Sequence, residues 1–213
     1  MKKAKRIAVA GATGMVGQAF QNLLEKNFFP EAEIDLLASQ KSKGRSVTFR
    51  GKEHIIKDLS EYDFSNTDLA LFSAGASVSA EYAPKAVSQG CVVVDNSSCF
   101  RYDDEIALIV PEVNGDELLN YDLPSIIANP NCSTIQMLVA LKPIHEEFKI
   151  KRIDITTLQA VSGTGKEATE ELLDQLSAYQ GNNELENNIY PKQIANNALP
   201  HCDVMEENRY TKE

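Results

Sequence analysis

One cysteine of this chain stands where a reactive thiol is expected. Cys132 belongs to the run Asn129-Pro-Asn-Cys-Ser-Thr134, which follows a short apolar segment and opens a predicted helix. A thiol in a first helical turn lies near the positive end of the helix dipole and near free backbone N–H groups. Those groups favour the thiolate and can stabilise an oxyanion. Cys132 is therefore our candidate nucleophile, whereas Cys91, Cys99 and Cys202 are interpreted as small buried side chains.

A glycine-rich turn near the N-terminus gives the second chemical signal. Gly11, Gly14 and Gly17 follow the apolar run 6–10 and lead into apolar residues at helical spacing over 15–24. Glycines at such a turn allow a tight bend and a close approach of backbone N–H groups to a pyrophosphate. The spacing differs from GxGxxG, and a turn without a ligand is the alternative. Its place between a strand and a helix favours a dinucleotide site.

The end of the second predicted strand, 34–38, bears on the choice of dinucleotide. An NAD site places an acidic residue at this strand tip, where it binds the ribose 2′-hydroxyl. Here Asp35 lies inside the strand, and the tip carries Ser39, Lys41 and Ser42. These side chains could hold a 2′-phosphate, so we predict NADP. The alternative is that the lysine only solvates a loop.

The elements that position these residues alternate along the chain. Short runs that are apolar on both faces, typical of a parallel sheet covered by helices, follow at 69–73, 91–95, 106–110 and 125–128. Helices are predicted at 79–88 and 133–148, and a hairpin over 47–49 and 54–57. We predict an α/β fold, a Rossmann-type, doubly wound, mostly parallel sheet, over residues 1–131. Its ligands are expected at the carboxyl ends of the strands.

Residues 132–213 are interpreted as part of an α+β catalytic and dimerisation domain. The segment 150–160 alternates apolar and polar residues, which predicts a strand in a second sheet with one wetter face. A helix is predicted over 167–179, and the polar and proline-containing stretch 180–200 is predicted to be loop.

Composition excludes several classes of function. Acidic side chains outnumber basic ones 31 to 21 in 213 residues, a formal net charge of −10, which repels nucleic acids and anionic membranes. The four cysteines show neither metal-ligand spacing nor the density of a disulfide scaffold. No apolar run has the length of a signal-peptide core or a membrane span. We expect a cytoplasmic protein without a metal site.

Five segments together resemble a known family. They are GATGMVG (11–17), DNSSCFR (95–101), VPEVN (110–114), NPNCSTIQM (129–137) and QAVSGTG (159–165). In this order and spacing they resemble the aspartate-semialdehyde dehydrogenases, particularly the bacterial ones, along the whole chain. The related N-acetyl-glutamyl-phosphate reductases share the architecture but usually carry a Gly-Cys-Tyr motif at the nucleophile, which this chain lacks.

The resemblance implies an NADP-dependent, phosphorylating reaction that reduces aspartyl phosphate to aspartate semialdehyde and releases phosphate, within lysine, threonine and methionine biosynthesis. It implies that Cys132 forms a thioester, that Asn131 lies beside it, that Gln159 orients the substrate and that Arg101 binds phosphate. Without the resemblance, we would interpret Arg101 as an exposed salt-bridge partner and Gln159 as an ordinary strand residue. The implied cofactor contacts are Gly11, Thr13, Gly14, Met15, Val16, Gly17, Ser39, Lys41, Ser42, Ser73, Gly75, Asn96, Ser162 and Gly163. Arginine is common in the family where Lys41 stands.

Family members continue beyond position 213, with the acid/base histidine and the substrate-binding arginine in that continuation, and they are homodimers or homotetramers at full length. None of His54, His145 and His201 lies in a segment resembling that of the catalytic histidine. We therefore interpret the chain as an N-terminal portion that binds NADP with little turnover. The alternatives are an NADP-binding, oligomer-forming module without turnover, or a related acyl-phosphate reductase.

Overall fold

The computed structural model describes residues 4–26, 28–181, 186–200, 202 and 205–211. The chain divides into two compact units, Met1–Asp154 and Ile155–Glu213. Each is described by itself. The predicted functional boundary between residues 131 and 132 stays a prediction.

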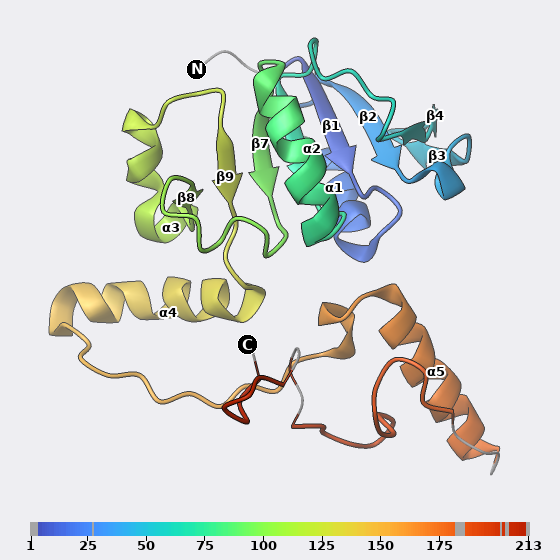
Figure 1. Cartoon of the computed structure of the whole chain (residues 1–213), viewed down its shortest axis with the longest axis vertical. Coiled ribbons are helices and arrows are strands. Elements are labelled where there is room, and N and C mark those ends of the chain that lie inside the picture. The colour runs from blue at the N-terminus through green and yellow to red at the C-terminus, as the bar shows by residue number, and fades with distance from the viewer. Residues whose placement is uncertain (1–3, 27, 182–185, 201, 203–204, 212–213) are drawn as a thin grey trace. The chain divides into compact units, whose positions relative to one another are not determined.

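A seven-stranded sheet, parallel throughout, forms the centre of the first unit (Figure 1). Its strands are β1 (Arg6–Ala10), β2 (Glu33–Ala38), β5 (Lys57–Asp58), β6 (Leu69–Phe72), β7 (Val92–Asp95), β8 (Ala107–Leu108) and β9 (Ile126–Ala128). Their order in the sheet is β5-β2-β1-β6-β7-β9-β8. The order reverses at β1, the first strand, which is the arrangement of a doubly wound sheet. The predicted fold class is confirmed.

The two faces of the sheet bury different side chains because successive residues of a strand point to opposite sides. Ile7 and Val9 of β1 pack in a core with residues of helix α1 (Met15–Glu25). Ala8 and Ala10 pack in a second core with residues of helix α2 (Ala76–Ser88). The two helices accordingly lie on opposite faces (Figure 1). Burial on both faces explains why the strands lack alternation in sequence.

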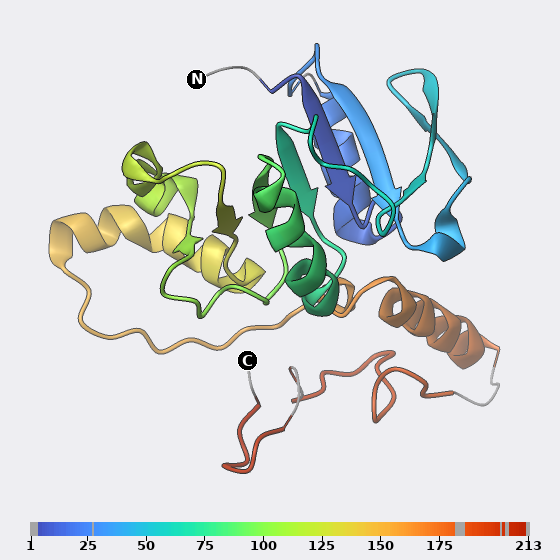
Figure 2. The same ribbon diagram turned by 45° about the horizontal axis from the view of Figure 1, so that its top comes forward.

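A hairpin of β3 (Ser46–Phe49) and β4 (Lys52–Ile55) lies beside β2 (Figure 2). The hairpin is confirmed, but Lys57 belongs to β5, which pairs with β2. Arg50, at the hairpin turn, donates through its guanidinium to carbonyl oxygens at the end of α1 and in the loop after it, including Leu24 O at 2.7 Å. This contact ties the hairpin to the helix.

Three short helices in the described part of the first unit were not predicted. They are the 3-10 turn η1 (Gln40–Ser42), the helix α3 (Pro111–Asn114) and the 3-10 turn η2 (Gly115–Asn120). The long helix α4 (Cys132–Phe148) starts one residue before its predicted boundary and contains Pro143. No helix in the described part of the chain is both long and apolar enough to cross a membrane.

The prediction of a strand over 150–160 is wrong. These residues have no assigned strand, and Ile153, Ile155 and Leu158 are 47%, 60% and 90% exposed. Alternation becomes a strand only where a neighbouring strand accepts and donates the backbone hydrogen bonds. No strand in the described residues pairs with this segment. The second unit contains the turn η3 (Val161–Gly163) and the confirmed helix α5 (Lys166–Gln180), followed by loop.

Candidate active site

The predicted site residues of the first unit lie in the loops that follow the strands β1, β2, β6, β7 and β9, or in the first turn of the helices that these loops enter. These strands are parallel neighbours, so their carboxyl ends share one edge of the sheet. The residues of that edge are Gly11, Thr13, Gly14, Met15, Val16, Gly17, Ser39, Lys41, Ser42, Ser73, Gly75, Asn96, Arg101, Asn131 and Cys132.

The glycine turn is built for a close backbone approach. A Cβ on Gly11, which has a φ of +85°, would lie 2.8 Å from the carbonyl carbon of Ser73. A Cβ on Gly17 would lie 2.1 Å from the Gly11 carbonyl oxygen. Helix α1 begins after Gly14 without a side-chain cap and without an acidic residue in its first turn. The positive end of the helix dipole favours an anion here, and these residues fit a dinucleotide pyrophosphate.

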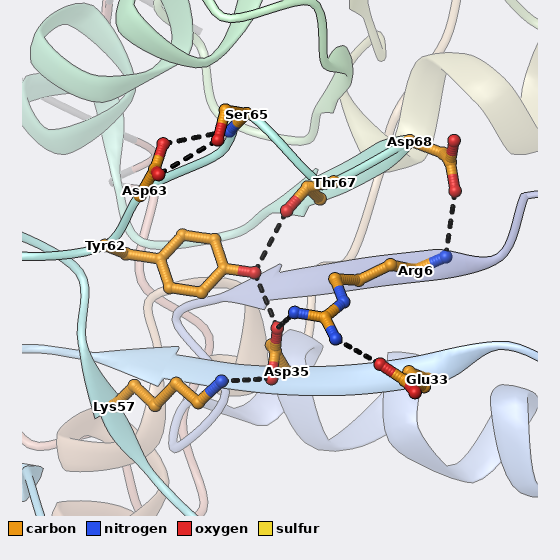
Figure 3. A network of polar contacts seen from close by, with 9 residues as sticks. All are labelled: Arg6, Glu33, Asp35, Lys57, Tyr62, Asp63, Ser65, Thr67 and Asp68. Carbon is orange, nitrogen blue, oxygen red and sulfur yellow. Dashed lines mark hydrogen bonds and ion pairs between the residues drawn. The ribbon is translucent and has the colours of Figure 1, made fainter.

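The carboxylate of Asp35 is bound by side chains within the sheet and not at the tip of β2 (Figure 3). Asp35 accepts from Lys57 Nζ at 2.5 Å and from Tyr62 Oη at 2.6 Å, and Arg6 lies 3.7 Å away. Burial, followed by the hydrogen bond to Asp35, raises the pKa of Tyr62. Tyr62 also bonds Thr67 at 3.0 Å. Asp35 therefore ties β1, β2 and β5 together.

At the tip itself, Ser39 and Lys41 are exposed, whereas Ser42 is only 8% exposed. Sequence reasoning missed Asp58, which pairs with Ala38 at the end of β5. Its carboxylate accepts from the backbone N and the hydroxyl of Ser60, at 2.9 and 2.7 Å. These bonds lower the pKa of Asp58 and occupy one of its oxygens. Only the pairing of β2 with β5 brings this acid to the strand tip.

Arg101 is held between two strand ends. Its Nε donates to the carbonyl oxygen of Asn129 at 3.0 Å, and its Nη2 donates to that of Asn96 at 3.2 Å. The side chains of Asn129 and Asn96 are joined by a 2.5 Å hydrogen bond. Arg101 and Asn96, the predicted phosphate-binding and cofactor-binding residues of the loop after β7, are thus connected to the loop that leads to Cys132. Sequence reasoning missed Asn129 as the connection.

Cys132 is exposed and is the first residue of α4. The side chain of Asn131 caps this helix, because its Oδ1 accepts from the backbone N of Ser133 at 2.9 Å and from the Ser133 hydroxyl at 2.7 Å. The cap fixes the direction in which the helix leaves the loop. Asn131 therefore lies beside the thiol for a structural reason.

The remaining thiols have different surroundings. Burial, with a smaller effect of Asp68, raises the pKa of Cys91 to about 12. Burial, followed by the charge of Asp95, also raises the pKa of Cys99. Cys91 is fully buried as predicted, but Cys99 and Cys202 are half-buried.

Three predicted site residues, Gln159, Ser162 and Gly163, belong to the second unit and are exposed within it. Gln159 Nε2 donates to Cys202 Sγ at 3.3 Å. A Cβ on Gly163 would lie 3.8 Å from Gln159 Oε1, so these two residues are neighbours. His54 packs edge-on against Phe49, His145 is exposed on α4, and His201 lies outside the described residues.

The doubly wound sheet and the glycine turn at the carboxyl edge of that sheet define the first unit of the chain as a Rossmann-type dinucleotide-binding domain. Family models agree: the semialdehyde dehydrogenase NAD-binding domain matches residues 6–121, and the semialdehyde dehydrogenase dimerisation domain matches residues 141–213. The chain belongs to the aspartate-semialdehyde dehydrogenase family.

Relatives with that name include the enzyme of Legionella pneumophila, 53% identical over the whole of this chain and 61% of its own length. The enzyme of Aquifex aeolicus is 50% identical over 98% of this chain and 62% of its own. The Vibrio cholerae aspartate semialdehyde dehydrogenase II, solved in complex with ASA, superposes with a TM-score of 0.93 at 46% identity over 97% of this chain and 62% of its own. The chain thus spans about three fifths of the length of these relatives.

A more distant solved structure contains a dinucleotide. The Candida albicans enzyme, solved with NADP, is 31% identical, with a TM-score of 0.63 over 74% of this chain and 51% of its own.

Proposed function

We propose that this chain carries the cofactor-binding domain and the nucleophile of an NADP-dependent enzyme that reduces aspartyl phosphate to aspartate semialdehyde. One observation carries the proposal. Cys132 is exposed at the start of α4, directly after the loop whose Asn129 carbonyl holds Arg101. A thiol and an anion-binding guanidinium in adjoining loops suit an acyl phosphate, whose carbonyl and phosphate ends need these two groups.

In the proposed reaction, the Cys132 thiolate attacks the acyl carbon of aspartyl phosphate. A C–S bond forms, the C–O bond to phosphate breaks, and phosphate leaves with that electron pair. Arg101 holds the leaving phosphate through the N–H groups of Nη1 and Nη2 that face away from the two carbonyl oxygens. Backbone N–H groups at the start of α4 stabilise the oxyanion during the attack.

NADPH, when bound, supplies the hydride that reduces the acyl group. We assign its pyrophosphate to the turn from Gly11 to Gly17, including Thr13, Met15 and Val16, with further contacts from Ser73, Gly75 and Asn96. Ser162, Gly163 and the substrate-orienting Gln159 are assigned from the second unit. The C–S bond then breaks, which releases the aldehyde and returns the thiolate. The match to the dimerisation-domain model supports a homo-oligomer built through residues 132–213.

The nucleophile is tested by mapping alkylated cysteines after brief iodoacetamide treatment at neutral pH. Cys132 should react first, since it alone is exposed and stands at a helix start. Bound NADP should change its rate. Cys99 is the matched control, because it lies in an adjoining loop and its pKa is raised. Earlier labelling of Cys99 or Cys91 would contradict the assignment.

The choice of NADP over NAD is tested at Lys41. We assign the 2′-phosphate to Ser39, Ser42 and Lys41, of which the lysine is the exposed cation. One partly exposed lysine–phosphate contact contributes roughly 1–2 kcal/mol, so NADPH should bind about ten-fold more tightly than NADH. Fluorescence titration of both cofactors should show that Lys41→Ala removes the preference. Asp58→Asn is the complementary variant. If the wild type binds NADH more tightly than NADPH and Asp58→Asn loses that preference, the acid Asp58 is assigned to the ribose instead.

A binding module without turnover would show the same cofactor affinity. It would form no covalent adduct between Cys132 and aspartyl phosphate, which intact-mass measurement of the denatured protein detects. A related acyl-phosphate reductase would instead form its adduct with another acyl phosphate, such as N-acetyl-glutamyl phosphate.

A further inference from the structure

Three segments of the first unit share one local turn. In Asp58-Leu-Ser60, Asp63-Phe-Ser65 and Asp95-Asn-Ser97, the aspartate accepts from both the backbone N and the hydroxyl of the serine two residues later. Turns of this kind are ordinary at exposed positions such as Asp63. Asp58 and Asp95 are buried instead, at 5% and 0% exposed, and each is the last residue of its strand, β5 and β7.

Asp95 makes contacts that its own turn does not require. Its Oδ1 accepts from the hydroxyl of Ser79, near the start of α2, at 2.6 Å. Ser79 is itself 0% exposed. The backbone carbonyl of Asp95 accepts from Asn129 N at 2.9 Å. One residue thus joins the loop after β7 to α2 and to the loop that leads to Cys132.

These contacts determine the course of the chain toward Arg101. Ser97 donates its hydroxyl to Asp95 Oδ2 at 2.6 Å and accepts from Cys99 N at 3.1 Å. The turn so formed leads the chain to Arg101, whose Nη2 reaches back to the carbonyl of Asn96. The hydroxyls of Ser79 and Ser97 both donate to Asp95, which leaves the lone pairs of the Ser97 oxygen for Cys99 N.

We propose that Asp95 is a positioning residue, which acts through Ser97 to aim the guanidinium of Arg101 at the phosphate of the substrate. The inference rests on the proposed function, since it takes Arg101 as the phosphate ligand. Asn96 is held separately, because its N donates to Phe72 O at 2.9 Å and its side chain bonds Asn129. Loss of the Asp95 carboxylate therefore weakens phosphate binding and leaves cofactor binding intact.

The experiment measures how inorganic phosphate protects Cys132 from iodoacetamide in this chain, in a buffer otherwise free of phosphate. NADPH affinity by fluorescence and the thermal midpoint are measured on the same samples. Asp95→Asn and Ser97→Ala should each raise the half-protecting phosphate concentration about ten-fold. Their NADPH affinity should stay within about two-fold of the wild type, as the separate anchoring of Asn96 requires.

Two further variants serve as controls. Ser97→Thr keeps the hydroxyl, so phosphate should protect Cys132 in this variant as it does in the wild type. Asp63→Asn alters the same kind of turn at an exposed position and should leave the half-protecting phosphate concentration unchanged. The inference would be overturned if phosphate protects Cys132 in Asp95→Asn as well as in the wild type. It would also be overturned if this variant loses NADPH affinity by the same factor as it loses phosphate protection. If Asp95→Asn does not fold, the contrast between Ser97→Ala and Ser97→Thr decides.

Arg101→Lys separates this inference from the proposed function. Weaker protection in Arg101→Lys, with none lost in the Asp95 and Ser97 variants, overturns only the positioning role. Undiminished protection in Arg101→Lys overturns the phosphate assignment itself.

Discussion

The two units of this chain bury different kinds of side chain. The sheet unit, Met1–Asp154, has two apolar cores whose largest members include the fully buried Phe64 and Phe72. In the described part of the second unit, Ile155–Glu213, the buried residues are Ala168 and Ala195 with the polar Glu171 and Gln175. Apolar burial is non-directional, whereas hydrogen bonds fix one partner in one place. The first unit should therefore resist unfolding as a whole. In the second unit, we expect stability only where the polar contacts lie.

One face of α5 holds the loop that follows it. Gln175 Oε1 accepts from the backbone N of Ile194 at 2.9 Å and of Ala195 at 3.0 Å, and its Nε2 donates to Glu186 O at 2.7 Å. One turn earlier, Glu171 accepts from three consecutive backbone N–H groups of residues 188–190. The helix thus supplies the partners that a strand would otherwise give this loop.

The largest effect is expected from the apolar core of the sheet unit. Phe64→Ala should lower the free energy of unfolding by about 3–5 kcal/mol, because it removes a fully buried ring and leaves a cavity. Denaturant titration followed by circular dichroism measures the loss. Phe148→Ala, at a position that is 77% exposed, is the control and should lose less than about 0.5 kcal/mol. Equal losses at the two positions would contradict the description of the core.

A smaller and more local effect is expected at Gln175. Gln175→Leu keeps the side chain buried but leaves the N–H groups of Ile194 and Ala195 without their acceptor, a cost of about 1–3 kcal/mol. Hydrogen exchange should accelerate at these two amides, while the amides of the sheet keep their protection. Asp174→Asn, at the exposed neighbouring position, should accelerate neither. Acceleration in the sheet as well would show that the two units unfold together.

The same contrast explains which features sequence could predict. Runs such as 69–73 and 125–128 identify the sheet because a strand covered on both faces must be apolar throughout. The glycine turn and the start of α4 were likewise predictable, because local backbone geometry demands those residue types. The strand predicted over 150–160 failed, because alternation carries no information about whether a neighbouring strand exists.

Polar contacts between distant segments could not be predicted. The sequence predicts a helix over 167–179 but does not show that Gln175 is buried, since its partners lie in a loop without periodicity. In the same way, the motif 95–101 points to Arg101, whereas the role of Asn129 as its acceptor follows only from the pairing of β7 with β9. Such contacts depend on tertiary structure, which local patterns do not encode.

The smallest expected effect is a pH dependence confined to the second unit. Burial alone would raise the pKa of Glu171, but the N–H groups of Ile189, Asn188 and Tyr190 outweigh it and hold that pKa below its ordinary value of 4.5. A carboxyl group with a lowered pKa in the folded state stabilises fully above its ordinary pKa, and the contribution is lost as the pH falls through the lowered value. The protection factors of the three amides should therefore be constant from pH 7 to about 5 and should decline in more acidic solution. In Glu171→Gln this acid-dependent decline should be absent, whereas Glu170→Gln, which alters only an exposed pair with Lys166, should keep it. A decline of the same size in Glu171→Gln would mean that another group controls the loop, and that α5 holds it by Gln175 alone.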